Sequence, residues 1–455
     1  MAPAGTEIRP TQTAFPPGPT AFLSRLIYRP GRSPITFFEN LVKTYGPLVY
    51  LKSNGEHVYV VTEPSHIRDI FVTHQKKFKK GRGLERSKIL LGEGLLTSEG
   101  ESHLRQRRLI QPAFHKERIA SYADAMTDYA GRTMARWSDG GTVDVAEDMM
   151  RLTLGIVGKT LFDADVESQA RDVGQAMTNV MESFWLRMLP FADILERLPI
   201  PALRRAREAR ATLDGIIYRL IAERRKSPGD RGDLLSMLIL AQDEENHGRG
   251  MTDQQVRDEA ITLFLAGHET TANALAWSWY LISQSPEVEA RVHEEVDRVL
   301  GGRVPSARDI PALPYVEQVV TEAMRLYPPA WIIGRRALEP YRIDGYDIPP
   351  GAVLIVSPYL TQRDPRFFVN PNAFNPDRWT PAFKAALPPF AYFPFGGGTR
   401  RCIGESFAWM ELVLVLSTIA QRWHLSLVPG HPVTPQPVVT LRMKHGLKMT
   451  TWLRQ

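Results

Sequence analysis

The chain has 455 residues, of which 43% are hydrophobic and 23% are charged, so its composition is that of an ordinary folded protein. The formal net charge of +6 is too small to indicate a nucleic-acid partner. The single cysteine, Cys402, excludes an internal disulfide and a zinc site built from several cysteines, and it fits a reducing compartment.

Residues 1–29 are predicted to form an irregular segment, because Pro16, Pro17 and Pro19 break any early helix. They lack the charged start and the apolar stretch of a signal peptide. No run in the chain reaches the ~18 apolar residues that a membrane-spanning helix needs. We therefore expect a cytoplasmic protein without a transmembrane anchor. Because no repeat or flexible linker interrupts residues 30–455, we expect a single domain there.

A hairpin is predicted first, with strands at Leu48–Leu51 and Val58–Val61 and a tight turn at Asn54 and Gly55. Helical periodicity then dominates residues 65–330. Short β-like runs lie between 341 and 356, separated by glycines and prolines. A proline-rich irregular segment over about 365–398 precedes one last apolar helix and a β-like tail. The pattern predicts a mainly α fold with small β-sheets, of the α+β class.

One predicted helix is unusually long. Thr252 can cap its N-terminus with Gln255 in a capping box, and no proline follows until Pro286. Residues 261–266 are apolar nearly all round, so the middle of the helix is expected to be buried. The segment Ala266–Thr271 then introduces a glycine and two threonines, which weaken a helix. This predicts that another group approaches the helix backbone closely there; a simple kink is the alternative.

The segment from Phe393 to Gly404 surrounds the cysteine with three glycines (Gly396–Gly398) and two arginines, Arg400 and Arg401. A lone cysteine is usually a small buried apolar residue. Here the arginines and the start of the following helix are expected to lower the pKa of the thiol, and a metal ligand or a nucleophile needs the thiolate. A phosphate loop is excluded because no Gly-Lys-Ser/Thr follows. A cysteine hydrolase is disfavoured because no histidine is tied to the segment.

This segment resembles the haem-binding motif of the cytochrome P-450 family, Phe-x-x-Gly-x-Arg-x-Cys-x-Gly, at Phe395, Gly398, Arg400, Cys402 and Gly404. Three further motifs precede this segment in the chain, in the order in which the family has them. Residues 266–271 resemble its oxygen-activating motif, residues 322–325 its Glu-x-x-Arg motif, and residues 374–379 the segment whose arginine completes a Glu-Arg-Arg triad. The resemblance covers about residues 30 to 450. It implies the P-450 fold, with a long central distal helix over a haem b.

The resemblance also implies roles for individual residues. Cys402 would be the axial ligand of the iron, and Glu269 and Thr270 would relay protons during oxygen activation. Glu322, Arg325 and Arg378 would form a structural triad. The other implied haem-binding residues are Ala266, Gly267, Phe395 and Gly404, together with His103, Arg107, Arg335 and Arg400 at the propionates. A solvated basic helix face is the alternative for residues 105–108.

The implied reaction inserts one oxygen atom from O2 into a lipophilic small molecule. Because the chain ends soon after Cys402, we expect separate electron donors: a ferredoxin or flavodoxin with its NAD(P)H reductase, steered by Arg105 and Arg108. A monomer is expected. The implied pocket residues are largely apolar, although an ordinary core has the same composition: Leu96, Phe184, Phe264, Ala266, Ala330, Trp331 and Ile332. Residues 331–336 resemble bacterial terpenoid-oxidising members, and fatty acids, steroids and polyketides stay open as substrates.

Two other functions fit a haem–thiolate site. An isomerase, a dehydratase or a peroxide-driven enzyme would use the same fold, but such relatives commonly lack the acid–alcohol pair that Glu269 and Thr270 provide. A non-catalytic haem-binding protein would have no use for that pair, and the sequence adds no signalling module. The monooxygenase is therefore the favoured interpretation.

Overall fold

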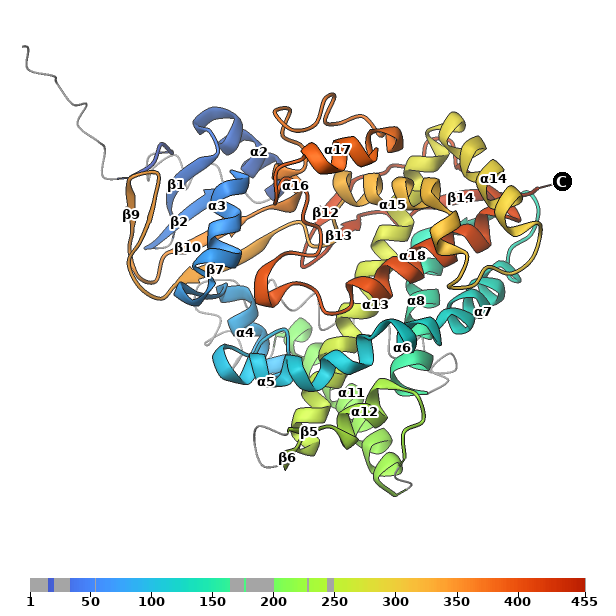
Figure 1. The fold of residues 1–455 in the computed structure, drawn as a ribbon, viewed down its shortest axis with the longest axis horizontal. Helices are drawn as coiled ribbons and strands as arrows, with labels where there is room; N and C mark the ends of the chain where they lie inside the picture. Colours follow the sequence, from blue (N-terminus) through green and yellow to red (C-terminus); the bar gives the residue numbers. More distant parts are fainter. Residues whose placement is uncertain are drawn as a thin grey trace, which may run out of the picture.

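A computed structural model describes residues 15–19, 33–53, 55–163, 176, 200–226, 229–243 and 249–454. These residues form a mainly helical molecule whose largest sheet lies on the left in Figure 1, with the small sheets distributed around the helices. The helices are α2 (Pro34–Tyr45), α3 (Pro64–Arg68), α4 (Arg82–Leu91), α5 (Gly100–Ile110), α6 (Lys116–Ala120), α7 (Ala123–Met134), α8 (Val145–Phe162), α11 (Pro201–Lys226), α12 (Leu234–Leu240), α13 (Asp253–Ser283), α14 (Pro286–Leu300), α15 (Pro314–Leu326), α16 (Pro358–Thr361), α17 (Pro381–Ala386) and α18 (Glu405–Ala420).

The largest sheet has the strand order β1-β2-β10-β7-β3. Its strands are β1 (Leu48–Ser53), β2 (Glu56–Val61), β3 (Phe78–Lys80), β7 (Ile333–Ala337) and β10 (Val353–Val356). β10 runs parallel to β2 and antiparallel to β7, and β3 pairs antiparallel with β7. This register places Lys80 opposite Arg335 at the edge of the sheet, so it brings together two basic residues that lie far apart in the sequence.

The other strands form small sheets around the helices. β4 (Gly141–Asp144), β11 (Trp423–Leu427) and β14 (Lys448–Leu453) form a three-stranded sheet in the order β11-β14-β4. Three hairpins are two-stranded: β5 (Gln242–Asp243) with β6 (Arg249–Gly250), β8 (Tyr341–Ile343) with β9 (Tyr346–Ile348), and β12 (Pro435–Pro437) with β13 (Leu441–Met443).

Helix α13 crosses the middle of the molecule and packs against α8 and α18 (Figure 1). Its N-terminus has the predicted capping box: the Thr252 hydroxyl accepts a hydrogen bond from the N–H of Gln255, and the Gln255 side chain accepts one from the N–H of Thr252. The helix ends at Ser283, and Pro286 starts α14 as predicted. Residues 261–265 are buried, as predicted from their apolar sequence, whereas Ala266, which the prediction included, is exposed.

The core consists of apolar clusters on both sides of α13. The largest lies between α7, α8, α15, α18 and the second half of α13, where Trp277 stacks on Tyr327 at 3.8 Å between ring centroids. A second cluster joins the first half of α13 to α11, α12 and the loop before α5. The loop that carries Cys402 leads into α18, and α18 packs within the largest of these clusters.

The predicted order of elements is confirmed, including the first hairpin, the short β runs over 341–356 and the last helix. Strands β3 and β4 were not predicted, because they are short, contain lysine or glycine, and form only by pairing with distant strands. Among the described helices, none is both long enough and apolar enough to cross a bilayer.

Candidate functional site

The loop before Cys402 depends on a close backbone contact that only glycine permits. Gly398 has a φ of +68°, and a Cβ there would collide with the carbonyl oxygen of Phe71. The N–H of Cys402 donates a hydrogen bond to the carbonyl of Phe395 at 3.0 Å. The N–H of Gly404 hydrogen-bonds the thiol, directly before the start of α18. The loop therefore holds Cys402, which keeps exposed surface, at the N-terminal end of α18.

The pKa of the Cys402 thiol contradicts the sequence prediction. Although Cys402 keeps exposed surface, desolvation by the protein around it raises this pKa to about 11, and the N–H of Gly404 and the charges of Arg107 and Arg401 act to lower it. Arg401 is paired with Glu405, at 2.5 Å between Nη2 and Oε1, and the Glu405 charge raises the thiol pKa further. The predicted low pKa was therefore wrong for the free thiol. Coordination to a metal ion would produce the thiolate that the arginines alone do not, because a coordinating thiol is deprotonated outright.

A short stretch of α13 is left uncovered within an otherwise buried helix. Ala266 is exposed and Gly267 is half-buried, whereas His268 and Glu269 beside them are buried. The hydroxyl of Thr270 donates to the carbonyl of Ala266 at 2.7 Å. Such bonds compete with the helix's own hydrogen bonds and loosen it locally. The predicted weak centre of the helix therefore coincides with the stretch at which α13 is accessible to solvent.

Glu269 lies buried in an ion pair that the sequence did not indicate. Its Oε1 accepts a hydrogen bond from Nε of Arg442 at 2.7 Å and another from the hydroxyl of Thr440. Burial acts to raise the pKa of Glu269, but the Arg442 guanidinium and the Thr440 hydroxyl outweigh burial, so the pKa is lowered. The carboxylate is consequently ionised, and the β12–β13 hairpin holds it in place.

Basic side chains gather around His103 on α5. Burial and the charges of Lys80, Arg400, Arg107 and Arg335 together lower the pKa of His103 to about 3, so the imidazole is neutral at physiological pH. The four predicted propionate-binding residues are thus near neighbours, as the resemblance implied.

Each of these basic residues is held by its surroundings. Arg335 is 7% exposed and lies over the ring of Phe71, with 4.5 Å from its guanidinium carbon to the ring centroid. Burial, followed by the charge of Arg400, lowers the pKa of Arg335 to about 10. Arg107 donates to the carbonyl of Arg401 at 2.7 Å, directly before Cys402.

Two residues of this cluster were missed by the sequence analysis. Lys80 is 5% exposed, and its backbone N–H donates a hydrogen bond to Oε1 of Glu99 at 2.6 Å. Glu99 also pairs with Arg400 through its other carboxylate oxygen. The signal in the sequence was only a basic run before Gly81, which is also common on protein surfaces.

The chemistry of these three parts fits haem b. A thiol with exposed surface can ligate an iron ion. The exposed Ala266 leaves a small side chain toward a planar ring, whereas Gly267 lets α8 approach, because a Cβ there would lie 3.0 Å from Cγ2 of Val157. The basic cluster holds the guanidinium cations of Arg107, Arg335 and Arg400 beside the Glu99 carboxylate that pairs with Arg400, so its excess of positive charge can accept the two negative charges of the propionates.

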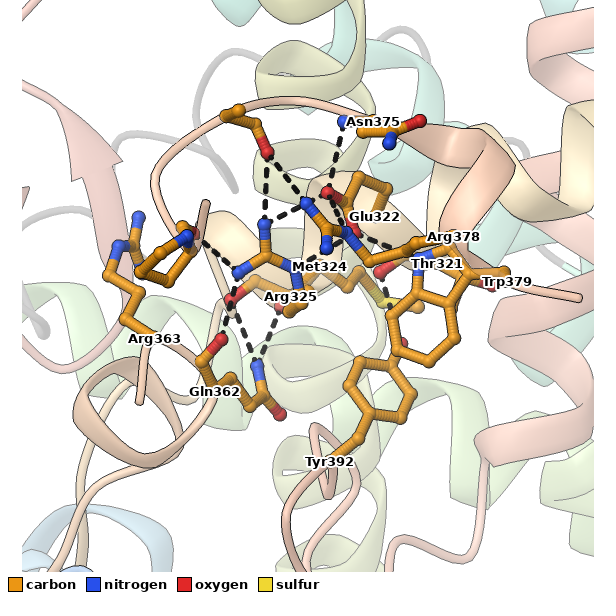
Figure 2. A network of polar contacts seen from close by, with 12 residues as sticks. Thr321, Glu322, Met324, Arg325, Gln362, Arg363, Asn375, Arg378, Trp379 and Tyr392 are labelled. Atoms are coloured by element: carbon orange, nitrogen blue, oxygen red, sulfur yellow. Dashed lines mark hydrogen bonds and ion pairs between the residues drawn. The ribbon is translucent and has the colours of Figure 1, made fainter. Parts of the chain in front are cut away.

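The predicted structural triad is assembled around Glu322 of α15 (Figure 2). Arg325 bonds its Oε2 at 2.8 Å through Nε, and Arg378 of the short helix η6 (Pro376–Arg378) bonds its Oε1 at 2.9 Å. The indole N–H of Trp379 and the backbone N–H of Asn375 also donate to this carboxylate, at 2.8 and 3.0 Å. Glu322 and Arg325 are fully buried, so the network joins α15 firmly to the segment before Cys402.

The predicted pocket residues fall into two groups. Leu96 packs into the apolar cluster that contains Phe264, and Ala266 follows on the same helix. Trp331 is instead buried in a separate cluster near α2, with Ile332 at its edge, and its indole N–H donates to the carbonyl of Val438 at 3.0 Å. Ala330 is half-buried just before it. Phe184 lies outside the described residues.

Comparisons with known proteins identify the family to which the chain belongs. The sequence model of the family "Cytochrome P450" (written P-450 below) matches residues 15–449. The chain is 39% identical to cyclooctatin synthase of Streptomyces melanosporofaciens, over 90% of this chain and 89% of the relative. It is 35% identical to pentalenene oxygenase of Streptomyces avermitilis, over 92% of both chains.

Solved structures agree as well. The haem domain of cytochrome P-450DA superposes with a TM-score of 0.87 at 28% identity, covering 97% of this chain and 98% of that one. Cyanobacterial CYP120A1 with bound retinoic acid superposes with a TM-score of 0.86 at 24% identity, covering 97% and 99% of the two chains, which shows a shared fold.

Proposed function

Because this chain belongs to the cytochrome P-450 family and is a haem-dependent monooxygenase, we propose that it oxidises a cyclic terpene-derived substrate. The acid–alcohol pair, Glu269 and Thr270, beside the exposed Ala266 of α13 supports the oxygen-activating reaction, and the names of the similar proteins carry the substrate class. Isomerising and peroxide-driven relatives commonly lack this pair. Residues 30–455 would form one domain, and electrons would come from a separate ferredoxin or flavodoxin with its reductase.

The substrate class is inferred from two sources. The names of similar proteins specify pentalenene and cyclooctat-9-en-7-ol as what those relatives oxidise. Leu96 and Phe264 supply apolar surface near Ala266, which favours a hydrocarbon skeleton. Trp331 would act as a support behind the pocket, because it is buried in a different cluster.

Bound haem would supply an iron centre that activates dioxygen when a cysteine thiolate ligates it. Cys402 would provide that thiolate from the start of α18. Arg335, Arg400, His103 and Arg107 would hold the propionates, together with Lys80.

The chain's own acid and alcohol would then move the proton. In the proposed relay, Glu269 leaves Arg442, takes a proton from water, and passes it toward the hydroxyl of Thr270. That hydroxyl donates to the carbonyl of Ala266 and so is held next to the uncovered stretch.

The experiment first identifies a substrate by spin-state titration with a panel of cyclic terpenes, fatty acids, steroids and macrolactones. We expect a cyclic terpene to give the shift at the lowest concentration. With that substrate, Thr270→Ala should form about tenfold less product for each NAD(P)H consumed. It should also release more hydrogen peroxide, because proton delivery fails. The matched control is Thr271→Ala, whose hydroxyl donates to Gly267 one position further on.

Tighter binding of a fatty acid or a steroid would contradict the substrate class. Unchanged coupling in Thr270→Ala, or equal loss in both threonine variants, would contradict the relay. The reduced, CO-bound protein should show the red-shifted Soret band of thiolate ligation, and Cys402→Ser should abolish it.

A further inference from the structure

The loop from Gly92 to Ser98, between α4 and α5, is held by side chains from several directions. The N–H of Glu93 donates to Oδ2 of Asp258 at 2.8 Å, and the carbonyl of Glu93 accepts from Nε2 of Gln106 at 2.6 Å. The backbone of Glu93 is therefore bonded at its N–H by α13 and at its carbonyl by α5.

The peptide units around Leu95 repeat this arrangement. The N–H of Leu95 donates to Oε2 of Glu259 at 2.8 Å. The ammonium of Lys80 donates to the carbonyl of Leu95 at 2.8 Å and to that of Ser98 at 2.6 Å. The loop is thus clamped between α13 and strand β3.

Two glycines bring the loop directly against α13. Gly92 has a φ of +70°, and a Cβ there would collide with the carboxylate of Asp258. A Cβ at Gly94 would collide with the hydroxyl of Thr262. The clamp therefore works at a distance that larger residues would prevent.

The side chains of this clamp are costly to bury. Lys80, Gln106, Asp258 and Glu259 are between 0% and 5% exposed. Burial lowers the pKa of Lys80 to about 7 and raises that of Glu259 to about 8. Connecting loops usually lie on the surface and need no such support. A loop held by buried ionisable groups is consequently under strong positional constraint.

The loop carries Leu95 and Leu96 into the cluster that contains Phe264, close to the uncovered stretch at Ala266. We propose that Glu259 and Lys80 are positioning residues that fix Leu95 and Leu96 against α13, and so set the shape of the substrate pocket on this side. The proposal rests on the proposed function, since that assigns the pocket to this end of α13. Lys80 also belongs to the basic cluster with Arg335 and Arg400, so one residue would link the haem edge to the substrate wall.

Hydrogen–deuterium exchange of the holoprotein tests the clamp directly at the amide of Leu95. In Glu259→Ala and in Lys80→Met this amide should exchange at least about tenfold faster than in the wild type. Glu259→Gln should stay near the wild-type rate, because the amide oxygen still accepts the bond. The control is Glu411→Gln, which alters another fully buried carboxyl, on α18 and away from the loop. Unchanged exchange at Leu95, or an increase of equal size throughout the protein, would overturn the proposal.

Pocket shape is tested by titrating the same variants with imidazole and with a bulky triaryl imidazole. If the loop is loosened, the bulky ligand should bind more tightly relative to imidazole, so that the ratio of the two dissociation constants changes by about fivefold or more. Glu411→Gln should leave this ratio unchanged. Faster exchange with an unchanged ratio would overturn the claim about the pocket. If the wild type shows no thiolate-type CO band, the proposed function fails, and the exchange at Leu95 still decides the clamp.

Discussion

Glu269 is ionised inside the protein because Arg442 and Thr440 hold its carboxylate from the β12–β13 hairpin. Burial by itself would raise its pKa, and the guanidinium reverses that effect. A carboxylate in this state is a poor proton donor until the ion pair loosens. The hairpin is therefore expected to control when Glu269 can act as a relay.

Removing the guanidinium should destabilise the fold, since it leaves a buried carboxylate without its charged partner. We expect Arg442→Ala to lower the free energy of unfolding by about 2 kcal/mol, below the roughly 3–5 kcal/mol of a fully buried pair, because Arg442 is partly exposed and Thr440 remains. Urea unfolding of Arg442→Ala, Glu269→Gln and the double variant measures this. The double variant should cost less than the sum of the single ones; strict additivity would show that the two side chains do not interact.

At the scale of elements, the junction between α15 and η6 depends on one carboxylate. Glu322 accepts bonds from Arg325, Arg378, Trp379 and the backbone of Asn375, and it is fully buried (Figure 2). Gln362 extends the network, since its side chain donates to the carbonyls of residues 324 and 325 and accepts from the N–H of residue 393. The segment that leads to Cys402 is thus fastened to α15 at several points.

Trp379→Phe removes one donor to Glu322 while keeping an aromatic side chain. Because the bond is buried and its acceptor is charged, we expect the free energy of unfolding to fall by about 2 kcal/mol. Trp452→Phe is the control: this indole is 45% exposed, bonds the hydroxyl of Ser426 at the surface, and should cost less than about 0.5 kcal/mol. Equal costs for the two variants would contradict a special role for the Glu322 network.

At the scale of the whole molecule, the sequence predicted those features that neighbouring residues determine. The capping box at Thr252, the long helix and the loop around Cys402 were all readable from local patterns. Contacts across the fold had no such signal. Glu269 and Arg442 are 173 positions apart, and Lys80 lies beside Arg335 only because β3 pairs with β7.

The error in the pKa of the Cys402 thiol has the same origin. The neighbouring arginines were visible in the sequence, but the burial that dominates the pKa depends on packing by distant elements. Motifs therefore predicted the candidate functional residues, whereas their charge states required the structure.

Stability in acid is a property of the whole molecule, to which one histidine far from the site contributes measurably. His293 of α14 lies near Glu289, Asp297, His424 and Arg454, and its Nε2 is buried without a hydrogen-bond partner among the described residues. Burial, followed by the charge of Arg454, lowers its pKa from 6.5 to about 4. Between these values the unfolded chain binds a proton that the folded chain does not, so stability is lost as the pH falls below 6.5.

His293→Gln should remove this contribution. Between pH 7.5 and pH 5, the wild type should lose about 2 kcal/mol more of its free energy of unfolding than the variant, given 1.36 kcal/mol per pKa unit. Urea unfolding at the two pH values measures the difference. The control is His445→Gln at an exposed position, which should follow the wild type. If His293→Gln loses as much stability in acid as the wild type does, protonation of His293 is not what weakens the fold there, and His103 and His268, whose pKa values burial also lowers, become the candidates.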